Sequence, residues 1–545
     1  MEQIKKYWSS PDGLYTFKED VVISKEVIDK DSIKNRILLF SSTETWIDNK
    51  KNIEECEFKG IAIIIGNLIE LSEIISSIQL SKIERIIACR VKNTGHHVHK
   101  LLLVLNYSNN KRPYREIRER YTYCPSCGKS SKDYGGKKHH YPSDGTWIRD
   151  VWNIFVLEEP LENNKLFLEA IYNLYCLNSS QKIFVVKSKK QHKKKSLILN
   201  TILNDYSLIK GKKSFPTFVN NNQRLINGDC FEVLPWLKEQ KELFDLVFVD
   251  PPYNLGKKYD FYDDNQNLQK YKEWCITWEK LTYPLLETDG FFVILNTPLN
   301  ILTQLASILQ DYEFIDDIVW DDLAVPVTGK MQPTYYSIIF LGRKKNSINQ
   351  HWYQVRDAIY CKRDSCRNAP ESLRDGNSIW SDIHRTRQKA RRWEHPCNLP
   401  EELIERIIQI TQKSLNKEHL NILDYFAGVG TTTMAAIRKN CFSTGVEISK
   451  KYFETSKYRL ENLLFRNQNG KKIRNSKNGK TKRFIQKLVA KSLEESGRVG
   501  KGFTTSEQID WLIKKKVIQK EDVDIFIRPG ELLKGVGKGG APGEV

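Results

Sequence analysis

Short apolar runs alternate with longer, more polar stretches over two segments of the chain. In the first segment the continuous apolar runs at residues 61–65 and 101–105 predict buried strands. From about residue 222 the pattern predicts strands at 246–249, 291–295 and 421–424, and helices near 231–240, 268–288 and 400–415. Strands that alternate with helices of this length predict an α/β fold, with a mostly parallel sheet and helices on both faces.

Changes in composition divide the chain into three expected parts. Residues 1–200 form an N-terminal α/β region, and a basic run at residues 187–195 begins the expected linker. Residues 222–465 form a second α/β domain. Residues 466–545 are rich in lysine, glycine and asparagine and form a basic C-terminal extension.

Charge and cysteine content narrow the class of protein. The 545-residue chain carries a formal net charge of +19, which favours a polyanionic partner such as nucleic acid. No apolar run reaches the ~18 residues of a membrane span, and the N-terminus lacks the apolar core of a secretory signal. The 11 cysteines are an odd number and scattered, which favours reduced thiols in the cytoplasm over a disulfide framework.

The predicted strand 246–249 is followed by Asp250-Pro251-Pro252-Tyr253. The acid and the peptide carbonyls beside it can accept hydrogen bonds from an amino group. The prolines stiffen the turn and remove two backbone donors, and the tyrosine ring offers a face for stacking. These residues indicate a pocket for a flat ring with an exocyclic amine, such as adenine or cytosine. A plain proline-rich turn is the structural alternative.

A second motif spans residues 424–433, between a predicted strand and a helix. Gly428 and Gly430 allow a tight turn and a close approach of the backbone to a ligand, and the helix N-terminus presents unpaired N–H groups to a carboxylate. Glu447 ends the next predicted strand, where an acid can bind ribose hydroxyls. The pattern indicates a nucleoside-bearing cofactor, with a plain tight turn as the alternative. It has no third glycine and no P-loop lysine, which disfavours NAD and ATP.

Three acids follow predicted strands in the second domain. Asp229, Asp250 and Asp424 each stand at the carboxyl end of a strand. Because ligands of open α/β sheets bind beyond these ends, we expect the three side chains to line one crevice.

The two motifs together resemble those of amino-group DNA methyltransferases. Residues 426–430 resemble their S-adenosylmethionine motif, and residues 250–253 resemble their catalytic motif. The catalytic motif comes first, which is the order of the β-class, and residues 227–230 resemble the segment that contacts the adenine of the cofactor. The usual basic residue, proline and serine of the family are replaced here by Leu399, Tyr425 and Val429.

The resemblance implies a Rossmann-like methyltransferase sheet over residues 222–465, with a target-recognition segment at about 316–395. It implies methyl transfer from S-adenosylmethionine to a base flipped out of double-stranded DNA, without a metal in the reaction. The implied catalytic residues are Asp250, Pro251, Pro252 and Tyr253, the last stacking on the base. The implied cofactor-binding residues are Asp229, Cys230, Asp424, Phe426, Gly428, Gly430, Thr431, Thr432 and Glu447.

The acid at position 250 favours adenine N6 as the target, because cytosine-N4 members of the resembled family more often have serine there. Cytosine N4 is the first alternative. An RNA or protein-glutamine methyltransferase and an inactive DNA-binding paralogue are disfavoured by the motif order and by the intact motif residues. A restriction endonuclease is the partner that this kind of enzyme implies.

A basic cluster lies inside the expected target-recognition segment and is predicted to hold DNA phosphates. A solvated helix face is the alternative interpretation. The cluster comprises Arg385, Arg387, Lys389, Arg391 and Arg392, with Trp393 beside it.

Cys124 and Cys127 form a Cys-x-x-Cys pair with proline inside and glycine after it, within residues 121–140. Such a turn suits structural zinc, and a pair of reduced thiols is the alternative. The candidates for the missing ligands are His139, His140, Cys361 and Cys366.

A faint internal echo links the two halves of the chain. Residues 144–152 resemble residues 375–383, which aligns Ile148 with Ile379, and both stretches follow a cysteine pair. Either residues 1–200 are a decayed copy of part of the catalytic unit, used for DNA contact or assembly, or the similarity is due to chance.

Overall fold

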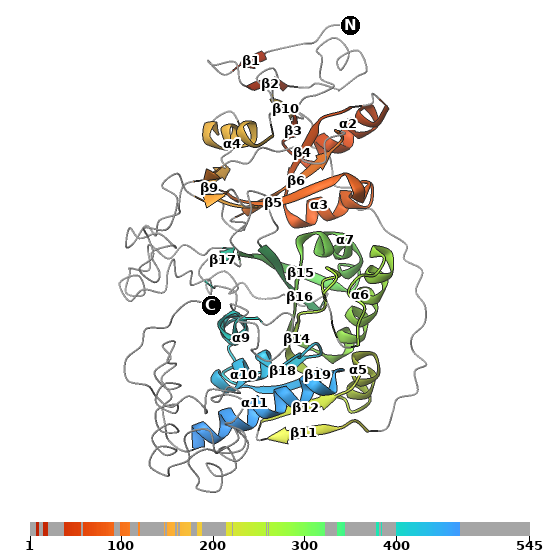
Figure 1. Ribbon diagram of the computed structural model, residues 1–545, viewed down its shortest axis with the longest axis vertical. Coiled ribbons are helices and arrows are strands. Elements are labelled where there is room, and N and C mark those ends of the chain that lie inside the picture. Colours follow the sequence, from red (N-terminus) through yellow and green to blue (C-terminus); the bar gives the residue numbers. More distant parts are fainter. Residues whose placement is uncertain are drawn as a thin grey trace, which may run out of the picture. The chain divides into compact units, whose positions relative to one another are not determined.

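Two mixed β-sheets organise the first part of the chain (Figure 1). The computed structural model divides the chain into two units, Met1–Glu461 and Asn462–Val545. It describes residues 7–9, 15–19, 37–55, 58–91, 99–108, 118–119, 146–147, 150–157, 161, 164–175, 183–187, 214–220, 222–257, 259, 261–321, 335–343, 378–380, 383 and 399–468.

The large sheet has nine strands in the order β11-β12-β19-β18-β13-β14-β16-β15-β17. The neighbours from β12 to β14 pair in parallel, whereas β11 and the β14-β16-β15 run pair antiparallel. The predicted mostly parallel sheet is thus confirmed for its centre and is mixed toward its margins. Its strands are β11 (Thr217–Asn220), β12 (Gln223–Asn227), β13 (Phe244–Val249), β14 (Leu286–Asn296), β15 (Tyr312–Asp321), β16 (Tyr335–Arg343), β17 (Ile379–Trp380), β18 (Asn421–Asp424) and β19 (Phe442–Glu447).

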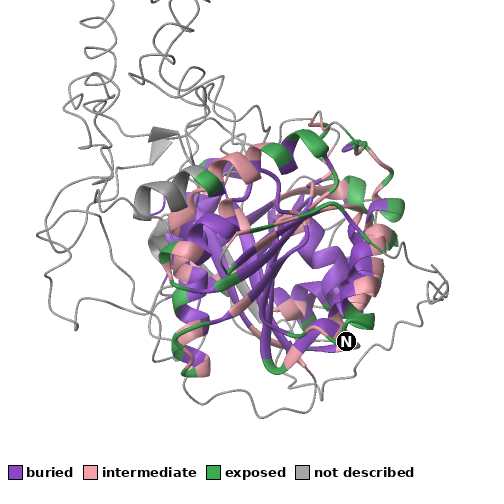
Figure 2. Ribbon diagram, turned by 90° about the horizontal axis from the view of Figure 1, so that it is seen from below, coloured by how far each residue is buried: buried purple, intermediate pink, exposed green. Residues whose placement is uncertain are grey.

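Helices cover both faces of the large sheet, as predicted. Along β13, Val247 and Val249 belong to the apolar cluster that contains residues of α5 (Cys230–Glu239), α6 (Leu268–Thr282) and α7 (Pro298–Ile308). Leu246 and Phe248 belong instead to the cluster with α9 (Glu401–Leu415) and α10 (Thr431–Arg438). The alternation follows from the two-residue side-chain period of a strand. Figure 2 shows the result as buried strands between helices whose outer faces are exposed.

The N-terminal sheet has eight strands in the order β1-β2-β10-β3-β4-β6-β5-β9. The apolar runs at 61–65 and 101–105 form two of its buried strands, as predicted. Its strands are β1 (Tyr7–Ser9), β2 (Tyr15–Glu19), β3 (Ile37–Phe40), β4 (Ile61–Gly66), β5 (Ile83–Val91), β6 (His99–Asn106), β9 (Val151–Leu157) and β10 (Ile183–Lys187). Its helices are α2 (Thr43–Glu55), α3 (Leu68–Ile75) and α4 (Lys165–Tyr175). Two short strands, β7 (Arg118–Glu119) and β8 (Thr146–Trp147), pair with each other.

Element ends differ from the sequence prediction where proline intervenes. The helix expected near 268–288 ends at Thr282, and Pro284 lies in the following 3-10 turn η6 (Tyr283–Leu285), because proline cannot continue the backbone hydrogen bonds of a helix. Helix α11 (Lys450–Gln468) follows β19. None of the described helices combines the length and apolar character needed to cross a membrane. The division of the chain into three domains stays a prediction.

Candidate active site

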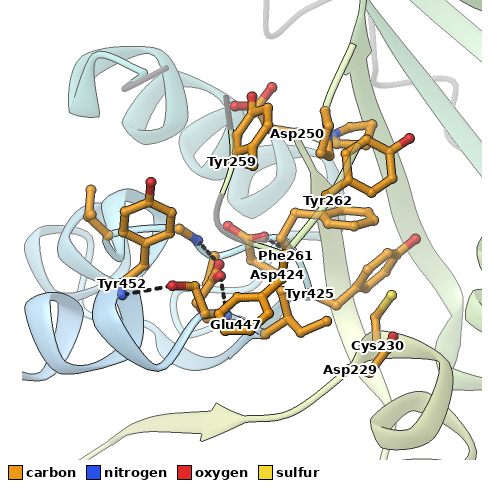
Figure 3. A pocket seen from close by; sticks show the side chains of 18 of the residues that line it. Asp229, Cys230, Asp250, Tyr259, Phe261, Tyr262, Asp424, Tyr425, Glu447 and Tyr452 are labelled. Carbon is orange, nitrogen blue, oxygen red and sulfur yellow. Dashed lines mark hydrogen bonds between the residues drawn. The ribbon is translucent and has the colours of Figure 1, made fainter. Parts of the chain in front are cut away.

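Four acids meet at the carboxyl edge of the large sheet. The neighbouring strands β12, β19, β18 and β13 run parallel, so their carboxyl ends lie side by side. Asp229, Glu447, Asp424 and Asp250 stand at or just beyond these ends and line one pocket (Figure 3). The expected crevice therefore exists. The predicted residues that line it are Asp229, Cys230, Asp250, Pro251, Pro252, Tyr253, Asp424, Phe426, Gly428, Thr431, Thr432 and Glu447.

The Asp250 carboxylate accepts a hydrogen bond from the Tyr253 hydroxyl. Burial raises the pKa of Asp250 to about 7, the Tyr253 hydrogen bond opposes this rise, and the nearby Asp424 charge adds to it. The pKa of Asp250 rises because removing the charged carboxylate from water costs free energy. At neutral pH this acid is therefore divided between its protonated and ionised forms.

The turn at residues 250–253 is held by side chains from α6 and α7. The Tyr271 hydroxyl donates to the Pro252 carbonyl at 2.7 Å, and Asn300 Nδ2 donates to the Tyr253 carbonyl at 2.9 Å. Asn300 also donates to Asn296, which itself donates to the Tyr271 hydroxyl. None of the described residues donates to the Pro251 carbonyl, so the network fixes the turn and leaves that acceptor for a ligand.

A second network fixes the segment that follows the turn. Asn254 adopts a left-handed conformation with a φ of 59°. The Asp264 carboxylate accepts hydrogen bonds from the backbone N–H groups of Asn254 at 2.7 Å, Leu255 at 3.1 Å and Lys257 at 2.9 Å. The loop is thus folded back on a buried acid before it reaches the pocket.

Backbone turns bring Glu447 against the glycine motif. The carboxylate accepts from Gly428 N through Oε2 and from Ser449 N through Oε1, each at 2.8 Å. A carboxylate oxygen can accept more than one hydrogen bond, so both oxygens keep capacity for a ligand.

Gly430 has a φ of +80° and directly precedes α10. Glycine adopts this left-handed conformation without the strain that other residues would have.

The buried Asp424 side chain holds the turn of the glycine motif through two hydrogen bonds. It is 4% exposed and accepts from Phe426 N at 2.9 Å and from the Thr432 hydroxyl at 2.5 Å. Burial raises the pKa of Asp424 to about 6, while these two hydrogen bonds lower it. The acid thus joins the end of β18 to the first turn of α10.

Asp229 and Cys230 begin α5 at the opposite side of the pocket. Asp229 caps this helix by accepting from Phe231 N at 2.9 Å. Burial, together with the Asp229 charge, raises the pKa of the Cys230 thiol well above its usual value. The thiol therefore stays neutral, which suits contact with an uncharged ring and not nucleophilic chemistry.

Aromatic side chains that the sequence reasoning missed form a wall of the pocket. Trp274 from α6 lies with its ring centroid 5.0 Å from that of Tyr262 and 5.5 Å from that of Phe426. Tyr259 and Phe261 also line the pocket (Figure 3), and Phe261 is 66% exposed. The dense aromatic run at residues 259–262 was the sequence signal that could have identified them.

Tyr253 is placed differently from the simple stacking role expected for it. Its side chain is 3% exposed, and its ring centroid lies 5.1 Å from that of Tyr336 and 5.6 Å from Lys257 Nζ. With its hydroxyl bound to Asp250, the ring offers no open face in this structure. Stacking on a base requires that contact to be released.

Two of the residues that depart from the family motif, Tyr425 and Val429, are buried and packed against their surroundings. Tyr425 is 2% exposed, packs against Trp278 at a centroid distance of 5.8 Å, and accepts a hydrogen bond from the Thr282 hydroxyl at 2.8 Å. Val429 is buried, and its carbonyl accepts a hydrogen bond from Arg459. These replacements thus contribute to the packing around the motif.

Several predicted residues lie outside the described part of the chain. These include Cys124, Cys127, the candidates for their partner ligands, and the basic cluster between Arg385 and Trp393. Within the described ranges no group of three or more histidine, cysteine, aspartate or glutamate side chains is placed to hold a metal ion.

Comparisons with known proteins match the same part of the chain. A protein-family model described as DNA methylase, of the N6/N4 type, matches residues 244–458. Type II methyltransferase M.HpaI of Haemophilus parainfluenzae is 30% identical over 246 residues, covering 44% of this chain and 74% of that protein. DNA adenine methyltransferase YhdJ of Escherichia coli (strain K12) is 28% identical over 256 residues, covering 45% of this chain and 84% of that protein.

Solved structures similar to this chain include M1.HpyAVI in complex with SAM. It is 20% identical, with a TM-score of 0.32, and the match covers 44% of this chain and 98% of that one. The PvuII DNA methyltransferase, described as cytosine-N4-specific, is 16% identical with a TM-score of 0.33, covering 46% of this chain and 94% of that one.

Proposed function

Since this chain belongs to the N6/N4 family of DNA methylases, we propose that it methylates the exocyclic N6 of adenine in double-stranded DNA, with S-adenosylmethionine as the methyl donor. The observation that carries the proposal is the position of Asp250. Its carboxylate stands at the end of β13, in one pocket with the Asp424 and Glu447 acids. The acid at position 250 supports adenine over cytosine as the target base.

The residues of the pocket fit S-adenosylmethionine. Both Glu447 oxygens are oriented by backbone N–H groups and keep acceptor capacity for two ribose hydroxyls. The left-handed turn at Gly430 opens the first turn of α10 to the pocket, where unpaired N–H groups attract a carboxylate. Asp229 and Cys230 suit the adenine, beside the aromatic wall formed by Trp274 and Phe426. When bound, S-adenosylmethionine supplies an electrophilic methyl group.

The residues at the turn act on the amine of the target base. An aromatic amine is a weak nucleophile because its lone pair is delocalised into the ring. The ionised Asp250 carboxylate accepts one amine hydrogen, and the Pro251 carbonyl, to which no described residue donates, accepts the other. These two hydrogen bonds localise the lone pair and orient it, so that proximity supplies much of the acceleration. The Asp250 charge also stabilises the positive charge that develops on nitrogen.

Tyr253 changes partner when the base enters. Its hydroxyl releases the carboxylate, which becomes free to accept from the amine, and its ring becomes available for stacking. The exposed Phe261 and its neighbour Tyr259 provide further aromatic surface at the pocket.

The base is not accessible inside a duplex, so it is flipped out at a cost of roughly a few kcal/mol. The net charge of +19 supports binding of the phosphates.

Product identification tests the proposal. The purified chain is incubated with unmodified genomic DNA and S-adenosylmethionine, and the digested nucleosides are analysed by mass spectrometry. We expect N6-methyldeoxyadenosine. N4-methyldeoxycytidine in its place would show that the target base is cytosine, and methylation of RNA or protein but not DNA would overturn the proposal.

A further inference from the structure

The N-terminal sheet repeats the strand pairing of the large sheet. In the run β10-β3-β4-β6-β5-β9 the successive pairs are parallel, parallel, antiparallel, antiparallel and parallel. The run β18-β13-β14-β16-β15-β17 has the same succession. The connections agree as well, because α2, α3 and α4 follow β3, β4 and β9 as α6, α7 and α9 follow β13, β14 and β17. An antiparallel hairpin precedes each run, β1-β2 in one and β11-β12 in the other.

The two sheets also share an irregularity at an equivalent position. Strand β5 is bulged between Ile83 and Arg85 where it pairs with β6. Strand β15 is bulged between Phe314 and Asp316 where it pairs with β16. Bulges are retained within families as features of a fold, so a shared bulge indicates common ancestry more strongly than a shared strand order does.

The two sheets also agree in register where the last strand begins, which is β9 in one sheet and β17 in the other. Ala88 N donates to Asp150 O at 2.8 Å, and Val319 N donates to Ser378 O at 2.7 Å. This makes Asp150 the counterpart of Ser378. Accordingly, Val151 pairs with β5 as Ile379 pairs with β15.

The strand register corrects the alignment of the internal sequence echo between residues 144–152 and 375–383. The sequence comparison matched Ile148 with Ile379, whereas the strand register matches Val151 with Ile379. Of its two interpretations, the shared topology, bulge and register favour duplication over chance.

The repeated region has lost the residues on which the proposed chemistry depends. By register Phe40 corresponds to Val249, so Ser41 stands where the large sheet has Asp250. Helix α2 begins at Thr43, without the loop that forms the pocket. Among the described residues, the N-terminal sheet has eight strands and no counterpart of β19, which carries Glu447. The sequence after β10 contains no glycine before Gly211, so the cofactor motif is also missing.

The two copies contact each other through equivalent elements. Helix α3 packs against its counterpart α7, and apolar residues of both belong to one buried cluster. His99 Nε2 donates to Asp317 at 2.9 Å, and the Tyr335 hydroxyl donates to the Ile86 carbonyl at 3.3 Å. By register His99 corresponds to Tyr335, and Ile86 corresponds to Asp317. The clustered residues are Leu68, Leu71, Ile74 and Ile75 of α3, and Ile301, Leu302, Leu305 and Ile308 of α7.

Contacts of this kind define a two-fold interface. In a symmetric dimer residue i of one subunit meets residue j of the other, and j meets i. His99 with Asp317 and Tyr335 with Ile86 satisfy this relation within one chain. The interface thus has the geometry expected when two subunits with the same fold have become joined.

We propose that the region from β1 to β10, residues 7–187, is a catalytically depleted second copy of the methyltransferase fold that serves as a built-in partner subunit. It covers α7, β15 and β16 of the large sheet, so one chain is the complete enzyme with one cofactor site. The copy also supports β15 and β17, two strands that lie partly or wholly within the expected target-recognition segment at about 316–395. His99, 5% exposed, bridges Asp317 of β15 and, through Nδ1 at 2.6 Å, the hydroxyl of Ser378 directly before β17.

Mass and activity of the full-length chain test the partner role. Sedimentation velocity is measured over the concentration range of the methylation assay, with the rate per chain determined at each concentration. We expect a 63.7 kDa species throughout and a rate per chain that does not change on dilution. A two-chain species in this range, or a rate per chain that falls as such a species dissociates, would overturn the proposal.

The number of cofactor molecules bound per chain tests separately whether the N-terminal copy has lost its cofactor site. Equilibrium dialysis of the full-length chain with labelled S-adenosylmethionine is expected to give one bound molecule per chain, and two would overturn the proposal. This count rests on the proposed function. If no cofactor binds, the proposed function fails, and the sedimentation result alone decides the partner role.

A double-mutant cycle tests the contact between the copies. His99→Ala, Asp317→Asn and the double variant are compared by thermal unfolding, with His419→Ala as a control at an exposed histidine. Because each single change leaves a buried polar partner behind, each lowers the midpoint by roughly 2–4 °C, and the double variant loses less than the sum. Strictly additive losses would show that the two side chains do not meet and would contradict the interface.

Discussion

The Tyr253 hydroxyl donates its hydrogen bond to the Asp250 carboxylate, so the proposed stacking ring and the proposed acceptor of the amine hold each other in place. The carboxylate is thereby kept partly ionised in a buried setting that favours its neutral form. The same contact keeps the ring, which lines the pocket, almost fully buried. Entry of a base therefore exchanges one donor to Asp250 for another.

The pH dependence of methyl transfer follows from this setting. Burial raises the pKa of Asp250 to about 7, and only the ionised form accepts a hydrogen bond through both oxygens. With cofactor saturating and DNA below saturation, where the rate reports the pKa values of the enzyme before DNA binds, we expect the rate to rise with pH through about 7 and to level off above 8. Single-turnover rates between pH 5.5 and 9 measure this. A rate that falls as pH rises through 7 would contradict the role of the carboxylate.

Removing the Tyr253 hydroxyl should shift that profile. In Tyr253→Phe the ring remains, but the hydrogen bond that lowers the pKa of Asp250 is lost. We expect the midpoint of the pH–rate profile to move upward, with a rate at pH 9 within about threefold of the unchanged chain. Tyr172→Phe, on α4 of the N-terminal region, is the matched control. A midpoint that stays in place or moves downward would show that Tyr253 does not influence this acid.

Glu447 should contribute to cofactor affinity through both of its oxygens. Glu447→Gln turns an amide N–H₂ toward one of two backbone N–H groups that now donate to the carboxylate, and it removes the charge. We expect S-adenosylmethionine to bind roughly 10- to 100-fold more weakly, as for loss of a charged hydrogen bond. Equilibrium dialysis of Glu447→Gln beside Glu239→Gln, an exposed glutamate at the end of α5, makes the comparison. Equal affinity of the two variants would remove Glu447 from the cofactor site.

Gly430 should tolerate no side chain. An added Cβ would lie 2.1 Å from Ser456 Oγ, and the φ of +80° is strained for any other residue. We expect Gly430→Ala to lower the thermal midpoint by several degrees and to weaken cofactor binding about 10-fold, from a strain of roughly 1–2 kcal/mol. The double variant Gly430→Ala/Ser456→Ala removes the contact with Oγ, leaves the Ser456 Cβ at 3.1 Å, and should recover only part of the loss. Full recovery would show that crowding, and not the backbone conformation, was responsible.

The sequence was sufficient to locate the pocket because its acids stand next to regular strands. Asp229, Asp250 and Asp424 each follow an apolar run, and parallel strands bring such positions to one edge of a sheet. The same reasoning could not reach Trp274, which lies on α6 far from either motif and enters the pocket only through helix packing. It also missed the state of Tyr253, since a hydrogen bond to a residue three positions earlier depends on the precise shape of the turn.

The alignment of the two copies of the fold could not be inferred from the sequence alone. The match between residues 144–152 and residues 375–383 was too short to fix its own alignment. Strand register fixes it, because the pairing of β5 with β9 and of β15 with β17 carries information that the side chains have lost. The shared bulges in β5 and β15 have no signature in the residues around Arg85 and Asp316, and become visible only in the paired strands.

The most direct test of the account compares Asp250→Asn with the unchanged chain in two assays. Asparagine keeps the shape of the side chain and an acceptor for the Tyr253 hydroxyl, but it has no charge and presents an amide N–H₂ to the amine. Transfer of labelled methyl from S-adenosylmethionine to unmodified DNA should fall by ~10²–10³-fold or more. Cofactor affinity in equilibrium dialysis should stay within about threefold, because the carboxylate serves the base and not the cofactor. A variant that methylates DNA at the normal rate would contradict the central role assigned to Asp250.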